Sequence, residues 1–87
     1  MAKAEISAVQ ETVEKTLAQS TIAAQFDGIA VDSDRHDDGF EFLRVKLRRS
    51  LFARLSDAQL TDITLKIEDA VGEIDDRVIS VRFGERN

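Results

Sequence analysis

Hydrophobic residues near the start of the chain recur with the period of an α-helix. They are spaced three or four positions apart: Ile6, Val9, Val13 and Leu17. This spacing places them on one side of a helix, where they can pack against the rest of the protein. The pattern predicts an amphipathic helix over residues 4–19.

Two segments in the middle of the chain alternate between apolar and polar residues, a pattern that is typical of β-strands. They cover residues 29–34 and 40–48, and their apolar positions are Ile29, Val31, Leu43, Val45 and Leu47. The short, Asp-rich and Gly-containing connection between them indicates a β-hairpin. Its pairing must bring both apolar sets to one face of the sheet.

The length of the hairpin loop decides this pairing. A two-residue loop would set Leu43 opposite Asp34, which mixes apolar and acidic positions along the whole ladder. A three-residue loop that ends in Gly39 instead sets Asp32 opposite Arg44 and keeps the apolar residues together. Such a loop is a known hairpin geometry, a type I turn followed by a glycine in the left-handed conformation. The sequence therefore predicts the three-residue loop.

A second helix and a third strand follow. Ser56 and Gln59 have the spacing of a capping box, and Gly72 fits the position just after a helix. The apolar face between them consists of Leu60, Ile63, Ile67, Ala70 and Val71. Residues 77–83 alternate again, which predicts a strand whose odd-numbered apolar residues face the helices.

The predicted element order is αββαβ, within a single α+β domain that covers residues 1–87. Two helices cannot easily cover both faces of three strands, so we expect a two-layer sandwich with both helices on one face of the sheet. The other face, called the outer face below, would carry Asp32, Asp34, Phe40, Phe42, Arg44, Lys46, Arg48, Val78, Ser80 and Arg82.

The amino-acid composition indicates the class of protein and its cellular location. The 87 residues are 43% hydrophobic and 33% charged and include no cysteine, which fits a soluble globular domain without disulfides or thiolate chemistry. No apolar run approaches the length of a membrane span, and the N-terminal segment lacks the apolar core of a signal peptide. We expect a cytoplasmic protein, of bacterial type, without a membrane partner.

Metal binding and catalysis find little support in the residues. The segment DSDRHDDG clusters four aspartates around His36, the only histidine, but its spacing does not match a calcium-binding loop. We interpret it as a solvated turn, with a metal site as the alternative.

Asp75 and Asp76 are expected to lie in a solvated loop, and the isolated glycines form no phosphate-binding motif. The sequence predicts no catalytic residues, no metal ligands and no cofactor, hence no enzyme.

The basic residues of the outer face suggest nucleic-acid binding as one function. The candidate contacts are Arg44, Lys46, Arg48 and Arg82. Phe40 and Phe42 would lie beside them, as aromatic platforms do in proteins that bind single strands. The net charge of −5 opposes this function, because nucleic acids need a cationic surface. Nucleic-acid binding is therefore the alternative hypothesis.

Apolar residues on the same face suggest a protein interface, and this is the leading hypothesis. Phe40, Phe42 and Val78 are placed where neither helix should cover them, and exposed phenylalanines are costly unless something buries them. We expect a protein-interaction or dimerisation module whose partner is another protein or a second copy, in a homodimer.

The layout also resembles a known family. The Asp-rich hairpin, the passage SLFARLSDAQLTDITLKIEDAV and the final RVISVRF are similar in order to the cytoplasmic C-terminal domain of cation diffusion facilitator transporters. Those domains are metallochaperone-like, have the order αββαβ and dimerise. Gln59 stands near the position where the family commonly has a histidine. The resemblance therefore implies the fold and dimerisation, and does not extend to a metal site.

Overall fold

The computed structural model describes residues 3–50 and 53–84 and has the predicted order of elements. The elements are helix α1 (Ile6–Ala18), a short 3-10 helix η1 (Ala23–Gln25), strand β1 (Phe26–Arg35), strand β2 (Glu41–Arg49), helix α2 (Asp57–Gly72) and strand β3 (Val78–Gly84). In the described part of the chain, no helix has both the length and the hydrophobicity to cross a bilayer.

The three strands form one sheet in the order β1-β2-β3, with β1 antiparallel and β3 parallel to β2. The predicted register is confirmed, since Asp32 lies opposite Arg44. The backbone N–H of His36 donates to the carbonyl oxygen of Phe40 at 2.8 Å and closes the three-residue loop. Gly39 has the positive φ, 87°, that this loop requires.

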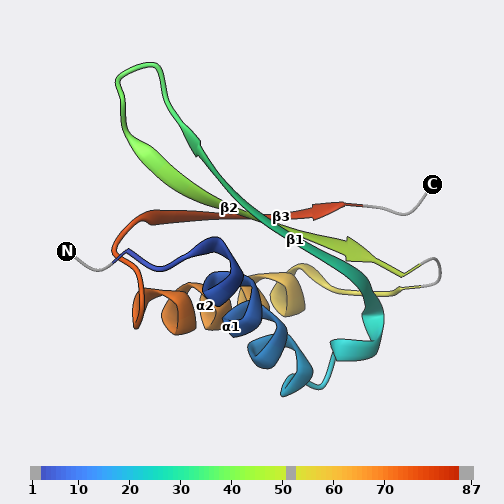
Figure 1. Cartoon of the computed structure of the whole chain (residues 1–87). Coiled ribbons are helices and arrows are strands. Elements are labelled where there is room, and N and C mark those ends of the chain that lie inside the picture. Colours follow the sequence, from blue (N-terminus) through green and yellow to red (C-terminus); the bar gives the residue numbers. More distant parts are fainter. Residues whose placement is uncertain (1–2, 51–52, 85–87) are drawn as a thin grey trace.

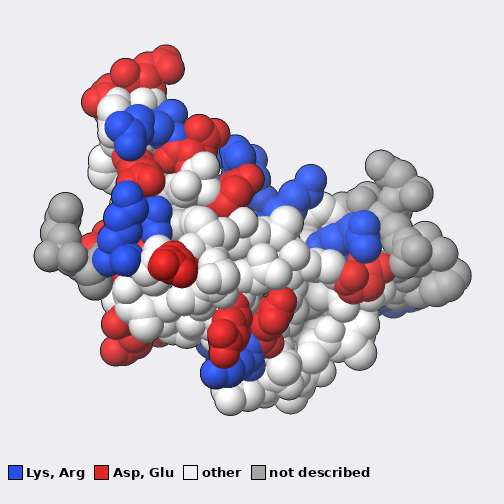
Figure 2. All heavy atoms as spheres, viewed as in Figure 1, with Lys and Arg blue, Asp and Glu red and all other residues white. Residues whose placement is uncertain are grey.

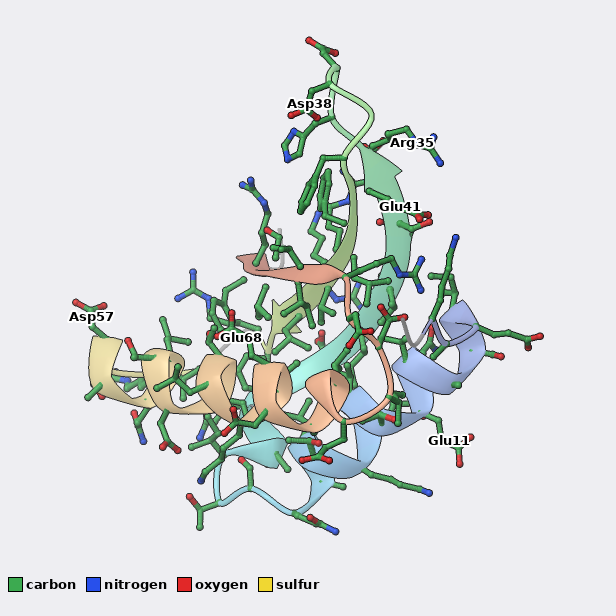
Figure 3. The ribbon with its side chains drawn as sticks, turned by 90° about the vertical axis from the view of Figure 1, so that its left-hand side faces the viewer. Glu11, Arg35, Asp38, Glu41, Asp57 and Glu68 are labelled. Carbon is green, nitrogen blue, oxygen red and sulfur yellow. The ribbon has the colours of Figure 1, made fainter. Side chains whose placement is uncertain are left out.

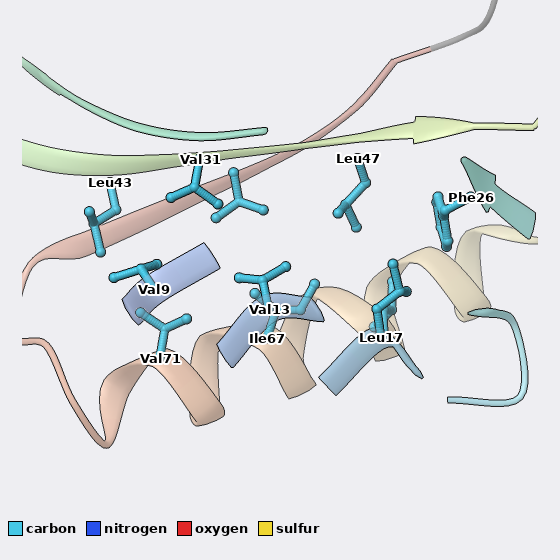
Figure 4. Packing of buried hydrophobic residues seen from close by; sticks show 11 residues of the cluster. Val9, Val13, Leu17, Phe26, Val31, Leu43, Leu47, Ile67 and Val71 are labelled. Carbon is cyan, nitrogen blue, oxygen red and sulfur yellow. The ribbon is translucent and has the colours of Figure 1, made fainter. Parts of the chain in front are cut away.

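Both helices pack on the same face of the sheet, as predicted (Figure 1). The core between the two layers consists of side chains from α1, β1, β2 and α2 (Figure 4), and the apolar residues of β3 pack against it while partly exposed. Its buried side chains are Val9, Val13, Leu17, Phe26, Val31, Leu43, Val45, Leu47, Ile63, Ile67 and Val71. Neither α1 nor α2 therefore covers the outer face.

The start of α2 follows the sequence prediction, whereas its end does not. The Ser56 hydroxyl accepts from the backbone N–H of Gln59 at 3.1 Å, and the Gln59 side chain accepts from the backbone N–H of Ser56 at 2.9 Å. This reciprocal pair is the predicted capping box. Gly72, however, is the last residue of the helix rather than the residue after it, and Glu73 caps the end with helical backbone angles.

Candidate functional site

Three of the predicted apolar residues lie together on the outer face. Phe42 and Val78 are cross-strand neighbours on β2 and β3, and Phe40 lies at the base of the hairpin loop. Phe40 is 48% exposed and Val78 is 55% exposed. Together with His36, described next, these residues are called the apolar patch.

His36 is part of this surface, which the sequence prediction missed. Its ring stacks on Phe42 with the two centroids 4.7 Å apart and an interplanar angle of 26°, and it lies 6.2 Å from the Phe40 ring. This position could have been predicted from the spacing of the residues. Positions 36 and 40 close the three-residue loop, so their side chains lie on the same face as that of residue 42. The histidine extends the apolar patch toward the end of the hairpin.

Two of the four basic candidates on the outer face are engaged by neighbouring aspartates. Arg44 donates to both carboxylate oxygens of Asp32, at 2.9 and 3.1 Å, and to Asp34 at 3.3 Å. These bonds, with Asp32 first, raise the pKa of Arg44 above its ordinary value. Arg48 pairs with Asp27 through a 2.8 Å contact. Cross-strand pairing thus satisfies Arg44 and Arg48 within the domain.

The other two basic candidates have no acidic partner among the described residues. Lys46 and Arg82 are cross-strand neighbours and both are exposed. Neither forms an ion pair with any residue in the parts of the chain that the structure describes. We call them the basic pair. These two adjacent like charges form a small cationic site on the outer face.

The end of the hairpin carries the opposite charge. Asp37 and Asp38 are both exposed, and acidic side chains cover the end of the hairpin in Figure 2. The Asp38 carboxylate accepts from the backbone N–H of Phe40 at 2.9 Å, as expected for an aspartate in a turn. These two residues are called the acidic tip. Over residues 3–50 and 53–84, no group of three or more acidic or histidine side chains is arranged to hold a metal ion.

A groove of about 390 Å³ runs beside the apolar patch. Its lining residues are Lys3, Gly39, Phe40, Glu41, Asp76, Arg77 and Val78. The groove is mostly apolar where Phe40 and Val78 contribute, and it is bounded by charged groups from the N-terminal segment and from the start of β3. It widens the surface that a protein partner could contact.

Arg77, which lines this groove, belongs to a buried ion pair with Asp75, where the sequence predicted a solvated loop. The prediction was wrong for Asp75, which is only 2% exposed. Its carboxylate accepts from the backbone N–H of Ala4 at 2.8 Å and from the Arg77 guanidinium at 2.6 Å. Arg77 in turn donates to the carbonyl oxygen of Ala4 at 2.8 Å. The Arg77 guanidinium holds the pKa of Asp75 well below its usual range, although burial opposes this shift.

The same network reaches β2 through Glu41. Arg77 contacts the Glu41 carboxylate at 3.4 Å, and Lys3 contacts it at 3.0 Å. The hydrogen bond from Lys3 is the main cause that lowers the pKa of Glu41. The network therefore joins the N-terminal segment, the start of β2 and the approach to β3 in one cluster.

Comparison with known proteins supports the fold and no more. The structure is similar to that of MamM V260R, with a TM-score of 0.55 at 15% sequence identity, over 97% of this chain and 100% of that chain. That protein is a C-terminal domain of a cation diffusion facilitator, so the family resemblance read from the sequence is confirmed at the level of fold. No protein-family model and no curated protein matches the sequence.

Proposed function

We propose that this domain is a protein-interaction module that self-associates through the apolar patch of its outer face. The observation that carries the proposal is the grouping of exposed Phe40 and Val78 with Phe42 on a face that neither helix covers. Apolar groups gathered in this way gain free energy when a partner removes them from water. The proposal gives the domain a binding role and no catalytic role.

The fold supports self-association as the form of binding. A domain of this size buries only about 60–65% of its unfolded surface, and a dimer adds apolar burial that the thin core lacks. The resemblance to the cation diffusion facilitator domain implies dimerisation in the same way. We therefore propose that the binding partner is a second copy of the chain and that the domain is located in the cytoplasm.

The test compares matched exposed apolar residues on opposite sides of the domain. The double variant Phe40→Ser/Val78→Ser removes the two most exposed members of the patch, and Leu65→Ser removes a residue on α2 that is 56% exposed. Sedimentation velocity over a range of protein concentrations should show a self-associating wild type and Leu65 variant. The double variant should associate at least about tenfold more weakly, which corresponds to about 1.4 kcal/mol.

All of these residues are substantially exposed, so each single substitution should change folding stability by no more than about 0.5 kcal/mol. Circular dichroism on the same samples checks that the variants remain folded. A wild type that is monomeric at every concentration, or equal association of all the proteins, would refute the proposal.

Nucleic-acid binding remains the second candidate, because the basic pair lies on the same face as the rings of Phe40 and Phe42. With Arg44 and Arg48 already paired to aspartates, at most two phosphates could be neutralised. The affinity for a single strand should then change with salt by a slope of only about −1.4 in log–log form. Fluorescence anisotropy with a labelled oligonucleotide at low salt tests this function. A steeper slope would favour nucleic acid over protein.

A further inference from the structure

We propose that two copies pack outer face to outer face with their strands antiparallel, so that the acidic tip of each copy lies against the basic pair of the other. This inference rests on the proposed function and specifies how the second copy is recognised. In such an isologous dimer each charged site is used twice, once on each side of the two-fold axis.

The spacing of the charged sites along β2 supports this arrangement. Asp38 lies four residues before Phe42, and Lys46 lies four residues after it. A two-fold axis that passes between the two Phe42 rings, perpendicular to the strands, therefore brings Asp38 of one copy toward Lys46 of the other. The apolar patches then meet at the centre. Facing sheets are separated by about 10 Å, a gap that long lysine and arginine side chains can bridge to an aspartate.

The shape of the hairpin supports the same arrangement. Val78, the first residue of β3, pairs with Phe42, so the hairpin beyond that point has no third strand beside it. In Figure 1 this part of the hairpin rises from the sheet on the side away from the helices. Asp38 lies at its end, and the side chain of Arg35 projects from the hairpin below it (Figure 3). The hairpin can thus reach over the outer face of a facing copy.

The opposite orientation is disfavoured by charge. If the strands of the two copies ran parallel, the acidic tips would face each other and so would the basic pairs. Like charges brought together at an interface act against association. The antiparallel orientation replaces both repulsions with attractions while it buries the same apolar patch.

Edge-to-edge pairing through β3 is a second way in which two copies could meet. β3 is an edge strand, and within the described ranges no backbone group outside the sheet bonds to it. Its sequence, VISVRFG, contains Arg82 and no acidic residue. Pairing of two such edges would bring the two basic pairs near one another with nothing to neutralise them. The charges therefore favour packing by the faces.

Charge exchange between the two sites tests the orientation. The first variant, Asp37→Lys/Asp38→Lys, reverses the acidic tip, and the second, Lys46→Glu/Arg82→Glu, reverses the basic pair. Each should self-associate about tenfold more weakly than the wild type in sedimentation velocity at low salt, because the contacts become repulsive. An equimolar mixture of the two variants should recover association as a mixed dimer, since both contacts are then attractive.

A matched control separates the local effect from a change in net charge. Asp69→Lys/Glu73→Lys makes the same change in net charge as the first variant, but on exposed positions near the end of α2. This variant should associate no more weakly than the wild type. Recovery in the mixture, together with an unaffected control, would establish the antiparallel arrangement.

Two results would contradict the proposed arrangement of the dimer. The first leaves self-association through the apolar patch intact, and the second contradicts that proposal as well. If the mixture associates no better than either variant alone while Phe40→Ser/Val78→Ser still abolishes association, the patch is used in another orientation. If neither the patch variant nor the charge variants change association, the copies meet elsewhere, for example through the edge of β3, and both proposals fail.

Discussion

Removal of the Asp75 carboxylate should destabilise the domain more than any surface substitution. The side chain is fully buried, and that of its partner Arg77 is only 11% exposed. Asp75→Ala would leave the backbone N–H groups of Ala4 and Arg77 without their acceptor and would remove the nearest carboxylate from the Arg77 guanidinium. Breaking a buried ion pair from one side costs about 3–5 kcal/mol.

This cost is large for a domain of this size. At about 0.05–0.15 kcal/mol per residue, 87 residues correspond to a free energy of unfolding of about 4–13 kcal/mol. The substitution should lower Tm by about 12 °C or more. Urea denaturation followed by circular dichroism measures the effect. As a control, Asp62→Ala breaks an exposed i,i+4 pair with Lys66 and should cost only about 0.3–0.5 kcal/mol.

The pH dependence of the free energy of unfolding gives an independent measure of the interaction between Asp75 and Arg77. Because the pKa of Asp75 is lower in the folded state than in the unfolded state, near 3.9, the unfolded state binds a proton more readily as the pH falls. The stabilisation is therefore complete above about pH 5 and is lost progressively below it. Asp75→Asn keeps the shape of the side chain but cannot titrate, so its stability should fall less between pH 5 and pH 3.

Either of two results would refute this reasoning. One is a change in the free energy of unfolding below about 1 kcal/mol for Asp75→Ala, which would mean that water replaces the carboxylate at little cost. The other is an identical loss of stability in the wild type and in Asp75→Asn between pH 5 and pH 3, which would assign the titration to other carboxylates.

Three further predictions test the fold. Leu43→Asp places a charge at a fully buried position and should unfold the domain, whereas Lys46→Asp on the outer face should leave it folded; equal damage in circular dichroism would contradict the assigned faces. Ser56→Ala removes the cap of α2 and should cost about 1 kcal/mol in urea denaturation, and no measurable change would argue against the capping box. Gly39→Ala adds a Cβ in open space, so its cost of about 1 kcal/mol should come from the positive φ alone; a stabilised variant would exclude the predicted turn.

The sequence predicted the hairpin because the rules that govern it are local. Matching the apolar faces of two strands that are close in sequence leaves one acceptable loop length, and Gly39 supports it. The capping box is local for the same reason, since Ser56 and Gln59 are three residues apart. In both cases the residues that determine the structure lie within a few positions of one another.

The burial of Asp75 could not be predicted from local sequence patterns. Its partners include the backbone N–H of Ala4, which lies 71 positions away in the sequence. An aspartate beside Asp76, and close to a glycine, has the composition of a solvated turn, and the hydrogen bonds of the N-terminal segment to Asp75 and Arg77 are formed only in the tertiary fold. The parallel placement of β3 beside β2 also depends on the tertiary fold. The contact of His36 with Phe42 lay within reach of the pattern, but it required the ring of a turn residue to fold back over the strand.

The buried network and the apolar patch are connected through the strands that carry them. Arg77 immediately precedes Val78 in the sequence, and its partner Glu41 lies between Phe40 and Phe42. Because residues alternate along a strand, the ion pair holds the two strands from the inner side while the apolar side chains are presented on the outer side. The relative position of Phe42 and Val78 is thus supported by the contact between Arg77 and Glu41, which both line the groove beside the apolar patch. A binding surface supported in this way loses little conformational freedom on association, which favours binding by a patch of only a few residues.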